Sequence, residues 1–370
     1  MSDISTDAAG ISPRAALGSI LAGHALVWPG ELGLHEREWL ELASAEQVVA
    51  LVDWRIRGGL AGVPEAVSQA FFSSARERVA HLMIRQAEAR RVLGMFAAAG
   101  ISCLLLKGSA LAYWAYPEVY LRECVDVDLL FADREDAVQA AGMLKNDGYV
   151  IRQHFGNAAS REFLCVRPKP DVWRVEFDMH WGLSGKPVFA RRLDFSELEA
   201  ESIPLPGLAP AARGLGAIHA CLHACMHRTA DLSNGSGDRL KWLFDLHLLA
   251  LSLNVADWSR LQALAIDRGI AGICADGFAQ AANVFHTPLP DGTLDELWRV
   301  SSGERLNPKR LRHWVYFQLE NLRSLPDWPS RAQWTWERLL PTADYREDVG
   351  VVDKGFFRDR ARRAMRRLSS

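Results

Sequence analysis

Acidic residues alternate with apolar residues in two short segments of the sequence. In VDVDLLF a single valine separates Asp126 from Asp128, and in VEFDMHW the polar residues Glu176, Asp178 and His180 alternate with apolar ones. A period of two places such side chains on one face of a β-strand. Neighbouring carboxylates repel one another unless a cation lies between them, and magnesium prefers oxygen ligands. We therefore predict that Asp126, Asp128 and Asp178 bind divalent metal ions, as phosphoryl-transfer chemistry requires.

A glycine-serine turn precedes the first acidic pair. The segment LLLKGSAL indicates a buried strand, a turn at Gly108 and Ser109, and the start of a helix. Backbone N–H groups at such a helix start bind phosphate oxygens. The Ser109 hydroxyl adds a hydrogen-bond donor, and Lys107 and Arg122 add positive charge. These four residues are the predicted contacts to a polyphosphate.

The elements that must position these residues form a small mixed α/β core. Apolar residues in ISCLLLKG and alternating residues over 125–130 and 175–180 indicate strands. Asp133 is a candidate N-cap of a helix that ends at Gly148, and YVIRQHF resumes strand character. The core is therefore expected over residues 100–190.

Helical periodicity flanks this core on both sides. Apolar residues recur at three- and four-residue spacing before Gly100, and again in GAIHACLHACMHRTA, DRLKWLFDLHLLALSL and RHWVYFQLENLRSL. The sequence predicts an N-terminal helical region over residues 1–99 and a C-terminal helical domain over 205–340, joined to the core by the proline-rich linker ESIPLPGLAP. A basic tail is expected over residues 341–370.

Composition limits the class of protein. The chain of 370 residues is 49% hydrophobic and 24% charged, which is typical of a globular protein. Its net charge of −2 gives no global attraction for nucleic acid, which is not an expected partner. Six cysteines lie scattered without a CxxC pair, which is typical of reduced thiols. We find no targeting segment and no apolar stretch of about 18 to 20 residues, so we expect a cytoplasmic protein without a membrane partner.

The order of these motifs resembles the DNA polymerase beta-type nucleotidyltransferase superfamily, in which a Gly-Ser turn precedes two aspartates on one strand and a third carboxylate on another. Here LLLKGSAL precedes YLRECVDVDLLF, a helix, a glycine and VEFDMHW. More closely, LKG, the arginine before DVDLL, DGY and the carboxylate-x-His-Trp motif resemble a family of uncharacterised bacterial nucleotidyltransferases. The motifs cover residues 104–181. Because His180 and Trp181 follow Asp178 in that family's register, the resemblance favours Asp178 over Glu176 as the third carboxylate.

The resemblance implies an α+β fold with a minimal nucleotidyltransferase mixed sheet, and dependence on Mg²⁺ or Mn²⁺. It also implies an NTP such as ATP as donor, whose NMP is transferred to a hydroxyl of an unidentified small-molecule, glycan or peptide acceptor with release of pyrophosphate. Carried over by position, Gly108 and Ser109 are the phosphate turn, Asp126 and Asp128 the metal ligands, and Asp178 the third carboxylate. Asp178 is also expected to orient or deprotonate the acceptor.

Two other functions use the same residues. A non-catalytic nucleotide-binding or scaffold protein with this core would bind nucleotide without releasing pyrophosphate. A small-molecule kinase would use the same acids but transfer phosphate, so that ATP would yield ADP. Product analysis distinguishes these alternatives from nucleotidyl transfer.

Two further features fall outside the acidic motifs. His219, His223 and His227 recur every four residues, but without the glutamate of HExxH or paired CxxC ligands they are more typical of packing, capping or pocket-lining side chains than of a zinc site. The arginine-rich tail is typical of an exposed solubilising helix, with binding to an acidic partner or RNA as the alternative.

Overall fold

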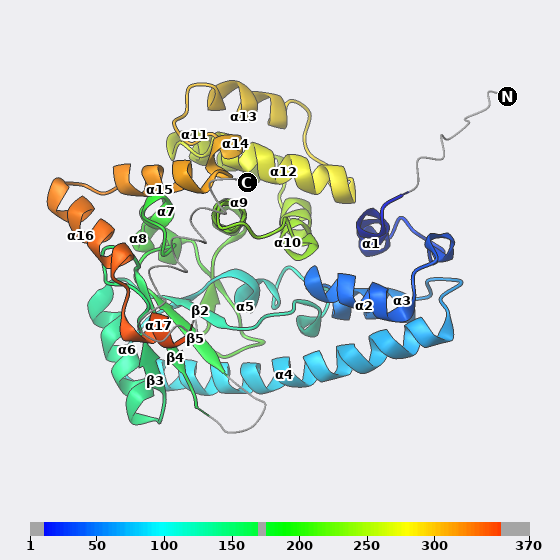
Figure 1. Ribbon diagram of the computed structural model, residues 1–370, viewed down its shortest axis with the longest axis horizontal. Helices are drawn as coiled ribbons and strands as arrows, with labels where there is room; N and C mark the ends of the chain where they lie inside the picture. The colour runs from blue at the N-terminus through cyan, green and yellow to red at the C-terminus, as the bar shows by residue number, and fades with distance from the viewer. Residues whose placement is uncertain (1–10, 169–174, 349–370) are drawn as a thin grey trace.

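A mixed sheet and many helices make up the computed structural model, which describes residues 11–168 and 175–348. The sheet has seven strands in the order β3-β4-β5-β2-β1-β7-β6, and helices lie on both sides of it (Figure 1). The expected α+β class is confirmed. The arginine-rich part of the predicted tail, residues 358–367, lies outside the described residues.

The strands are short. They are β1 (Leu104–Leu105), β2 (Val127–Leu130), β3 (Val150–Arg152), β4 (Glu162–Val166), β5 (Glu176–His180), β6 (Ile203–Pro204) and β7 (Arg213–Gly214). Strands were expected at the positions of β1, β2, β3 and β5, although the first acidic strand begins at Val127 instead of Val125. The interpretation of ESIPLPGLAP as a linker alone is wrong, because β6 lies in it and pairs with β7, which extends the sheet beside β1. Two-residue ladders leave no period-two pattern in the sequence.

Helices precede the sheet, as predicted from periodicity. They are α1 (Pro13–Ala22), the 3₁₀ helix η1 (Gly30–Leu32), α2 (Glu36–Ala45), α3 (Val49–Arg57) and α4 (Glu65–Ala98). The long α4 runs beneath the sheet in Figure 1. Gly100 ends the following turn with a φ of +74°, a backbone conformation that glycine adopts without a steric penalty.

Shorter helices lie between the strands. They are α5 (Lys107–Leu111), the 3₁₀ helix η2 (Val119–Leu121), α6 (Arg134–Asn146), α7 (Pro187–Ala190) and α8 (Phe195–Ala200). The predicted cap of α6 is confirmed, since the side chain of Asp133 accepts a hydrogen bond of 3.0 Å from the backbone N–H of Asp136. Gly148, with a φ of +89°, follows the end of that helix.

A second set of helices follows the sheet. They are α9 (Ala217–Ser233), α10 (Leu240–Leu251), α11 (Val255–Asp267), α12 (Ala271–Phe285), α13 (Thr293–Ser301), α14 (Pro308–Leu311), α15 (Trp314–Arg323), α16 (Trp328–Leu339) and α17 (Ala343–Asp348). In residues 11–168 and 175–348, no helix is at once long and apolar enough for a membrane crossing.

The two faces of the sheet differ in chemistry. Leu129 of β2 and Met179 of β5 are fully buried in a cluster with Phe96 of α4 and residues of α6. Since successive residues of a strand point to opposite faces, the intervening Asp128 and Asp178 lie on the face away from α4. The apolar residues of each acidic motif therefore anchor the strand and turn its acids toward the C-terminal helices.

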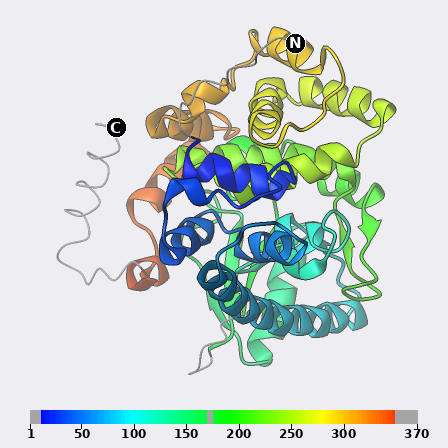
Figure 2. The same cartoon turned by 90° about the vertical axis from the view of Figure 1, so that its right-hand side faces the viewer.

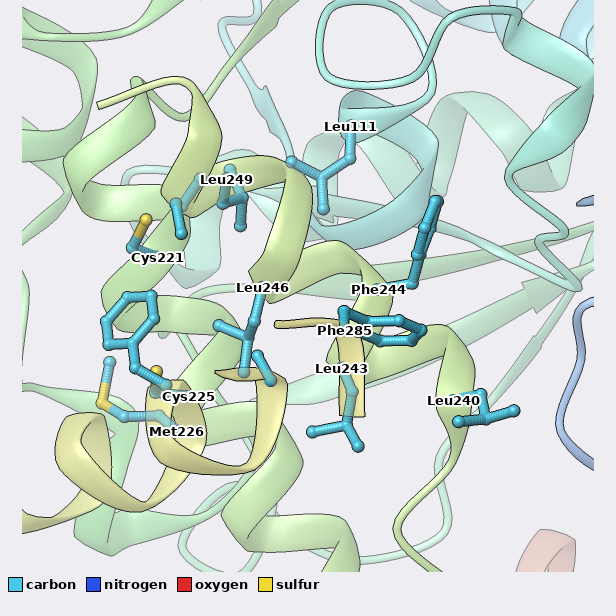
Figure 3. Close-up of a cluster of buried hydrophobic side chains, with 14 of the residues drawn as sticks. Leu111, Cys221, Cys225, Met226, Leu240, Leu243, Phe244, Leu246, Leu249 and Phe285 are labelled. Atoms are coloured by element: carbon cyan, nitrogen blue, oxygen red, sulfur yellow. The ribbon is translucent and has the colours of Figure 1, made fainter. Parts of the chain in front are cut away.

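The helical regions at the two ends of the chain share one core. Figure 3 shows Cys225 of α9, Leu246 of α10 and Phe285 of α12 packed together, with Leu111 of α5 in the same cluster. Leu17 of α1 is buried in this core too, and Figure 2 shows α1 beside the C-terminal helices. This core holds α9 close to α5 and the polar face of the sheet. The domain boundaries expected from the sequence stay predictions.

Candidate functional site

Strand pairing brings the two acidic motifs together. β2 and β5 are parallel neighbours, and Asp128 lies directly opposite Asp178 while Leu130 lies opposite His180. β4 pairs with the other edge of β5 in the antiparallel sense, which places Glu162 opposite His180. Three adjacent strands thus direct polar side chains to one place on the same face of the sheet.

Within the described part of the chain, Asp128, Asp178 and His180 form a potential metal-binding group. One ligand atom from each lies within 4.8 Å of the other two. The His180 Nε2 atom is 3.1 Å from Asp128 Oδ1, and its Nδ1 atom is 3.2 Å from Glu162 Oε2. His180 therefore links the carboxylates of β2 and β4.

Lys107 is the second cation at Asp128. Its Nζ atom donates a hydrogen bond of 2.6 Å to Asp128 Oδ1, and its backbone has a φ of +52°. Left-handed backbone is uncommon for residues other than glycine and is found at functional sites whose surroundings enforce it. Lys107 lies between β1 and the rest of α5, so this turn directs its side chain to the neighbouring strand β2.

The charges of the site are unevenly balanced. Burial opposes ionisation of Asp128, but the charge of Lys107 and the hydrogen bond from His180 hold its pKa well below its ordinary value. Burial, and then the nearby charge of Asp128, raises the pKa of Asp178 to about 7. Burial alone would lower the pKa of His180, yet the hydrogen bond to Asp128 and the contact with the Glu162 carboxylate raise it to about 10. These contacts favour the imidazolium form of His180, whereas no lysine or arginine of residues 11–168 and 175–348 forms an ion pair with Asp178.

Asp126 lies beside this group but outside it. The residue immediately precedes β2, and its ligand atoms are not among those of the potential metal-binding group in the described residues. It lines a separate small pocket together with Gly108 and Ser109. Burial, and then the charge of Asp128, raises the pKa of Asp126. Glu176, the alternative third acid, is likewise outside the group that contains Asp178.

The predicted phosphate turn is packed closely against its own surroundings. A Cβ atom added to Gly108 would lie 2.6 Å from Cys124 Sγ and 2.7 Å from Arg122 Cζ, so the glycine permits this approach. The Ser109 hydroxyl donates to the Leu106 carbonyl at 2.8 Å. Arg122 is buried, and its Nε and Nη2 atoms each donate to Asp245 at 2.7 Å. The turn shares a pocket with Asp126, while the guanidinium group of Arg122 is bound by Asp245 of α10.

Two cavities meet at the carboxylates. One, of about 180 Å³, lies between the sheet and α9 and is bordered by Lys107, Asp178, His223 and His227. The other, of about 300 Å³, lies over β3, β4 and β5. Both are lined by the same four residues, which are Glu162, Asp178, Gly185 and Lys186. The centre is therefore open to molecules from two sides.

The three histidines of α9 have different surroundings. His219 is buried, with its Nε2 atom 3.1 Å from Glu197 Oε1 of α8, so it joins two helices. His223 and His227 border the cavity above the acids. His227 Nε2 is 3.2 Å from Asp231 Oδ2, one turn further along α9. The pocket-lining interpretation therefore describes two of the three histidines.

Glu162 and Lys186 are site residues that the sequence analysis missed. Glu162 opens the segment EFLCV, whose short apolar run carries a weak strand signal. Lys186 ends the segment GLSGK, a glycine-containing turn directly after the second acidic strand. The sequence did contain a signal for Lys186. Both GLSGK and the earlier LKGS place a lysine beside glycine and serine directly after a strand.

The site combines carboxylate oxygens, which suit a hard divalent cation, with the basic side chains of Lys107 and Lys186. The two cavities give space for two molecules. In comparison with known proteins, the family model described as "Uncharacterised nucleotidyltransferase" matches residues 34–286. No curated protein matches the chain. The matched segment contains the acidic strands, the predicted phosphate turn and both histidines that border the cavity.

Proposed function

The chain belongs to the family of uncharacterised nucleotidyltransferases, and from this premise we propose that it is a Mg²⁺- or Mn²⁺-dependent enzyme that transfers NMP from an NTP such as ATP to a hydroxyl group. The acceptor is a small molecule, glycan or peptide, and pyrophosphate is released. The order of the Gly-Ser turn, the paired aspartates and the third carboxylate supports assignment to the DNA polymerase beta-type superfamily. The scattered cysteines support a cytoplasmic location.

One observation carries this proposal. Asp128 and Asp178, separated by 50 positions in the sequence, are register partners on adjacent strands, and Asp178 lines both cavities. A transferase that binds two substrates needs access for both of them at one charged centre. A structural acidic cluster would not need these two cavities.

The residues present fit a divalent cation. Asp126, Asp128, Glu162 and Asp178 supply four carboxylates, whereas in the described part of the chain the cations in contact with them are Lys107 and His180. Mg²⁺ and Mn²⁺ accept such oxygen ligands. We propose that Asp128 and Asp178 hold the metal and that Asp126 completes the site. When bound, the metal supplies Lewis-acid stabilisation of charge on the phosphate oxygens.

The protein's own groups have distinct roles in this proposal. Lys107 and the turn at Gly108 and Ser109 bind the phosphates of the donor and stabilise the leaving pyrophosphate. Arg122 adds positive charge behind that turn. The Asp178 carboxylate orients the acceptor hydroxyl and takes its proton.

Label transfer from NTPs tests this function. Purified wild-type protein and Asp128→Asn are incubated with magnesium, each NTP labelled at the α-phosphate, and a metabolite extract as the source of acceptors. We expect wild type to release pyrophosphate and to label a product, and Asp128→Asn to lose at least about 100-fold in rate because a metal ligand is lost. Asp291→Asn, on the exposed surface, is the matched control and retains the rate.

Other outcomes contradict the proposal. Equal turnover or equal nucleotide binding in wild type and Asp128→Asn would show that Asp128 is not a metal ligand for the donor. Stabilisation by nucleotide without pyrophosphate release would indicate a non-catalytic nucleotide-binding protein. In a parallel reaction with ATP labelled at the γ-phosphate, release of ADP with label on the product would indicate a kinase.

A further inference from the structure

A second turn containing glycine, serine and lysine lies over the acidic centre. Residues Ser184, Gly185 and Lys186 connect β5 to α7, and the backbone N–H of Lys186 donates to the Ser184 hydroxyl at 3.2 Å. A Cβ atom added to Gly185 would lie 2.6 Å from Glu162 Oε2. Glycine therefore allows this turn to lie directly against the carboxylate that holds His180.

Lys186 differs from Lys107 in its partners. The ammonium group of Lys107 is bound to Asp128. Across residues 11–168 and 175–348, the structure shows neither a hydrogen bond nor an ion pair for the ammonium group of Lys186, although the side chain is only partly exposed. A half-buried cation without a partner is costly, because burial removes water without replacing it. Such a cation is suited to a transient anionic ligand.

The position of Lys186 identifies which ligand group it meets. Its side chain lines both cavities, as does Asp178. In nucleotidyl transfer the attacking and leaving oxygens lie roughly in line on opposite sides of the phosphorus. If one substrate occupies each cavity, the phosphoryl group that passes between them lies where the cavities join. That place is bordered by Lys186.

We infer that Lys186 is a further substrate-binding residue, whose ammonium group contacts the α-phosphate of the nucleoside triphosphate during its transfer. This inference rests on the proposed function. The acceptor hydroxyl oxygen forms a bond to the α-phosphorus, and its proton passes to the Asp178 carboxylate. The bond from the α-phosphorus to the bridging oxygen breaks, and pyrophosphate leaves with that electron pair. Lys186 stabilises the negative charge on the non-bridging oxygens and exchanges no atoms.

The electrostatic surroundings agree with this role. Burial lowers the pKa of Lys186, and the negative charge of Glu162 is the largest influence that opposes this effect. A phosphate beside the ammonium group acts in the same direction as Glu162, so it favours the charged lysine. A bound donor therefore supplies the missing partner.

Paired substitutions test the inference. Lys186→Gln removes the charge, Lys186→Arg retains it, and Lys145→Gln changes an exposed lysine near the end of α6. With label transfer as above, we expect Lys186→Gln to reduce kcat by about 100-fold and Lys186→Arg to recover part of that loss. Lys145→Gln is expected to equal wild type. Thermal unfolding of each variant separates this effect from loss of folding, because a merely structural lysine would change the melting temperature instead of kcat.

The inference and the proposed function fail in different ways. If wild type transfers label and Lys186→Gln does so at the same rate, the inference is overturned and the function stands. If Lys186→Gln raises only the KM for the acceptor, Lys186 belongs to the acceptor site and the inference is also overturned. If wild type neither binds Mg-NTP nor transfers label, both are overturned.

Discussion

At the scale of single residues, the pKa values of the two facing aspartates of the site are shifted in opposite directions. Asp128 is bound by Lys107 and His180, which favour its ionised form. Asp178 is its register partner on β5, and burial together with the charge of Asp128 favours its protonated form. A divalent cation between them would reverse the state of Asp178, because it would supply the positive charge that this carboxylate lacks.

This difference predicts a pH-dependent stability. The pKa of Asp178 rises from 3.8 to about 7 on folding, so the native state binds the extra proton and stability falls as pH rises through that interval. Asp178→Asn cannot ionise. In a chelator, we expect its stability relative to wild type to increase between pH 4 and pH 8 by up to about 4 kcal/mol, at 1.36 kcal/mol for each unit of pKa. Urea unfolding at several pH values measures this difference.

Two controls accompany the measurement. Asp291→Asn, an exposed aspartate, should give a curve parallel to that of wild type. Magnesium should stabilise wild type more than Asp178→Asn, because it binds the native state of the protein that has both carboxylates. Parallel pH curves for wild type and Asp178→Asn would refute the assigned environment of Asp178.

At the scale of elements, two segments position the Glu162 carboxylate. One is strand β4, and the other is the turn between β5 and α7. Glu162 is held opposite His180 by strand pairing, and the turn lies against its carboxylate at Gly185. The orientation of His180 at Asp128 therefore depends on two elements that contribute no metal ligand to the Asp128, Asp178 and His180 group.

Crowding this turn should have the same effect as removing the Glu162 charge. Gly185→Ala places a methyl group 2.6 Å from Glu162 Oε2, so the carboxylate must shift from the position in which it contacts His180. We expect Gly185→Ala and Glu162→Gln each to reduce the rate of label transfer about tenfold, because each disturbs the contact of Glu162 that orients His180 beside Asp128. The double variant should be no slower than either single one. Gly237→Ala, where the added atom meets nothing within 4 Å, is the control; additive losses in the double variant would contradict the coupling.

At the scale of the whole molecule, the cavity exists because α9 is fixed above the sheet. Arg228 of α9 is completely buried, and it donates to Asp238 at 2.8 Å and to Asp276 of α12 at 2.7 Å. The guanidinium group thus joins α9, α12 and the segment before α10. The same helix carries His223 and His227 along the cavity wall.

Removing this link should destabilise the protein strongly. Arg228→Met keeps the apolar length of the side chain but removes the cation that Asp238 and Asp276 share. Asp276 keeps its ion pair with Arg312, so we expect a loss below the upper end of the range of about 3 to 5 kcal/mol for breaking a buried pair. Urea unfolding should show this loss in the midpoint. Arg37→Met breaks an exposed pair with Glu41 and should have no measurable effect. Equal midpoints for the two variants would show that Arg228 does not hold the helices together.

Sequence alone determined the local chemistry of this protein. The period-two alternation around Asp128 and Asp178 specified which side chains share a strand face, because that depends only on neighbouring residues. The helix before Gly100, the cap at Asp133 and the α+β class followed from equally local signals, as did the family resemblance.

Only the tertiary structure decided which groups meet. On the side away from β1, β2 pairs with β5 and not with the strand that follows it in the chain, and this order places Glu162 and His180 at the site. Whether Lys107 or Lys186 has a partner depends on contacts between segments distant in the sequence. Such contacts are set by strand order and helix packing over the whole chain, and no local spacing of residues encodes them.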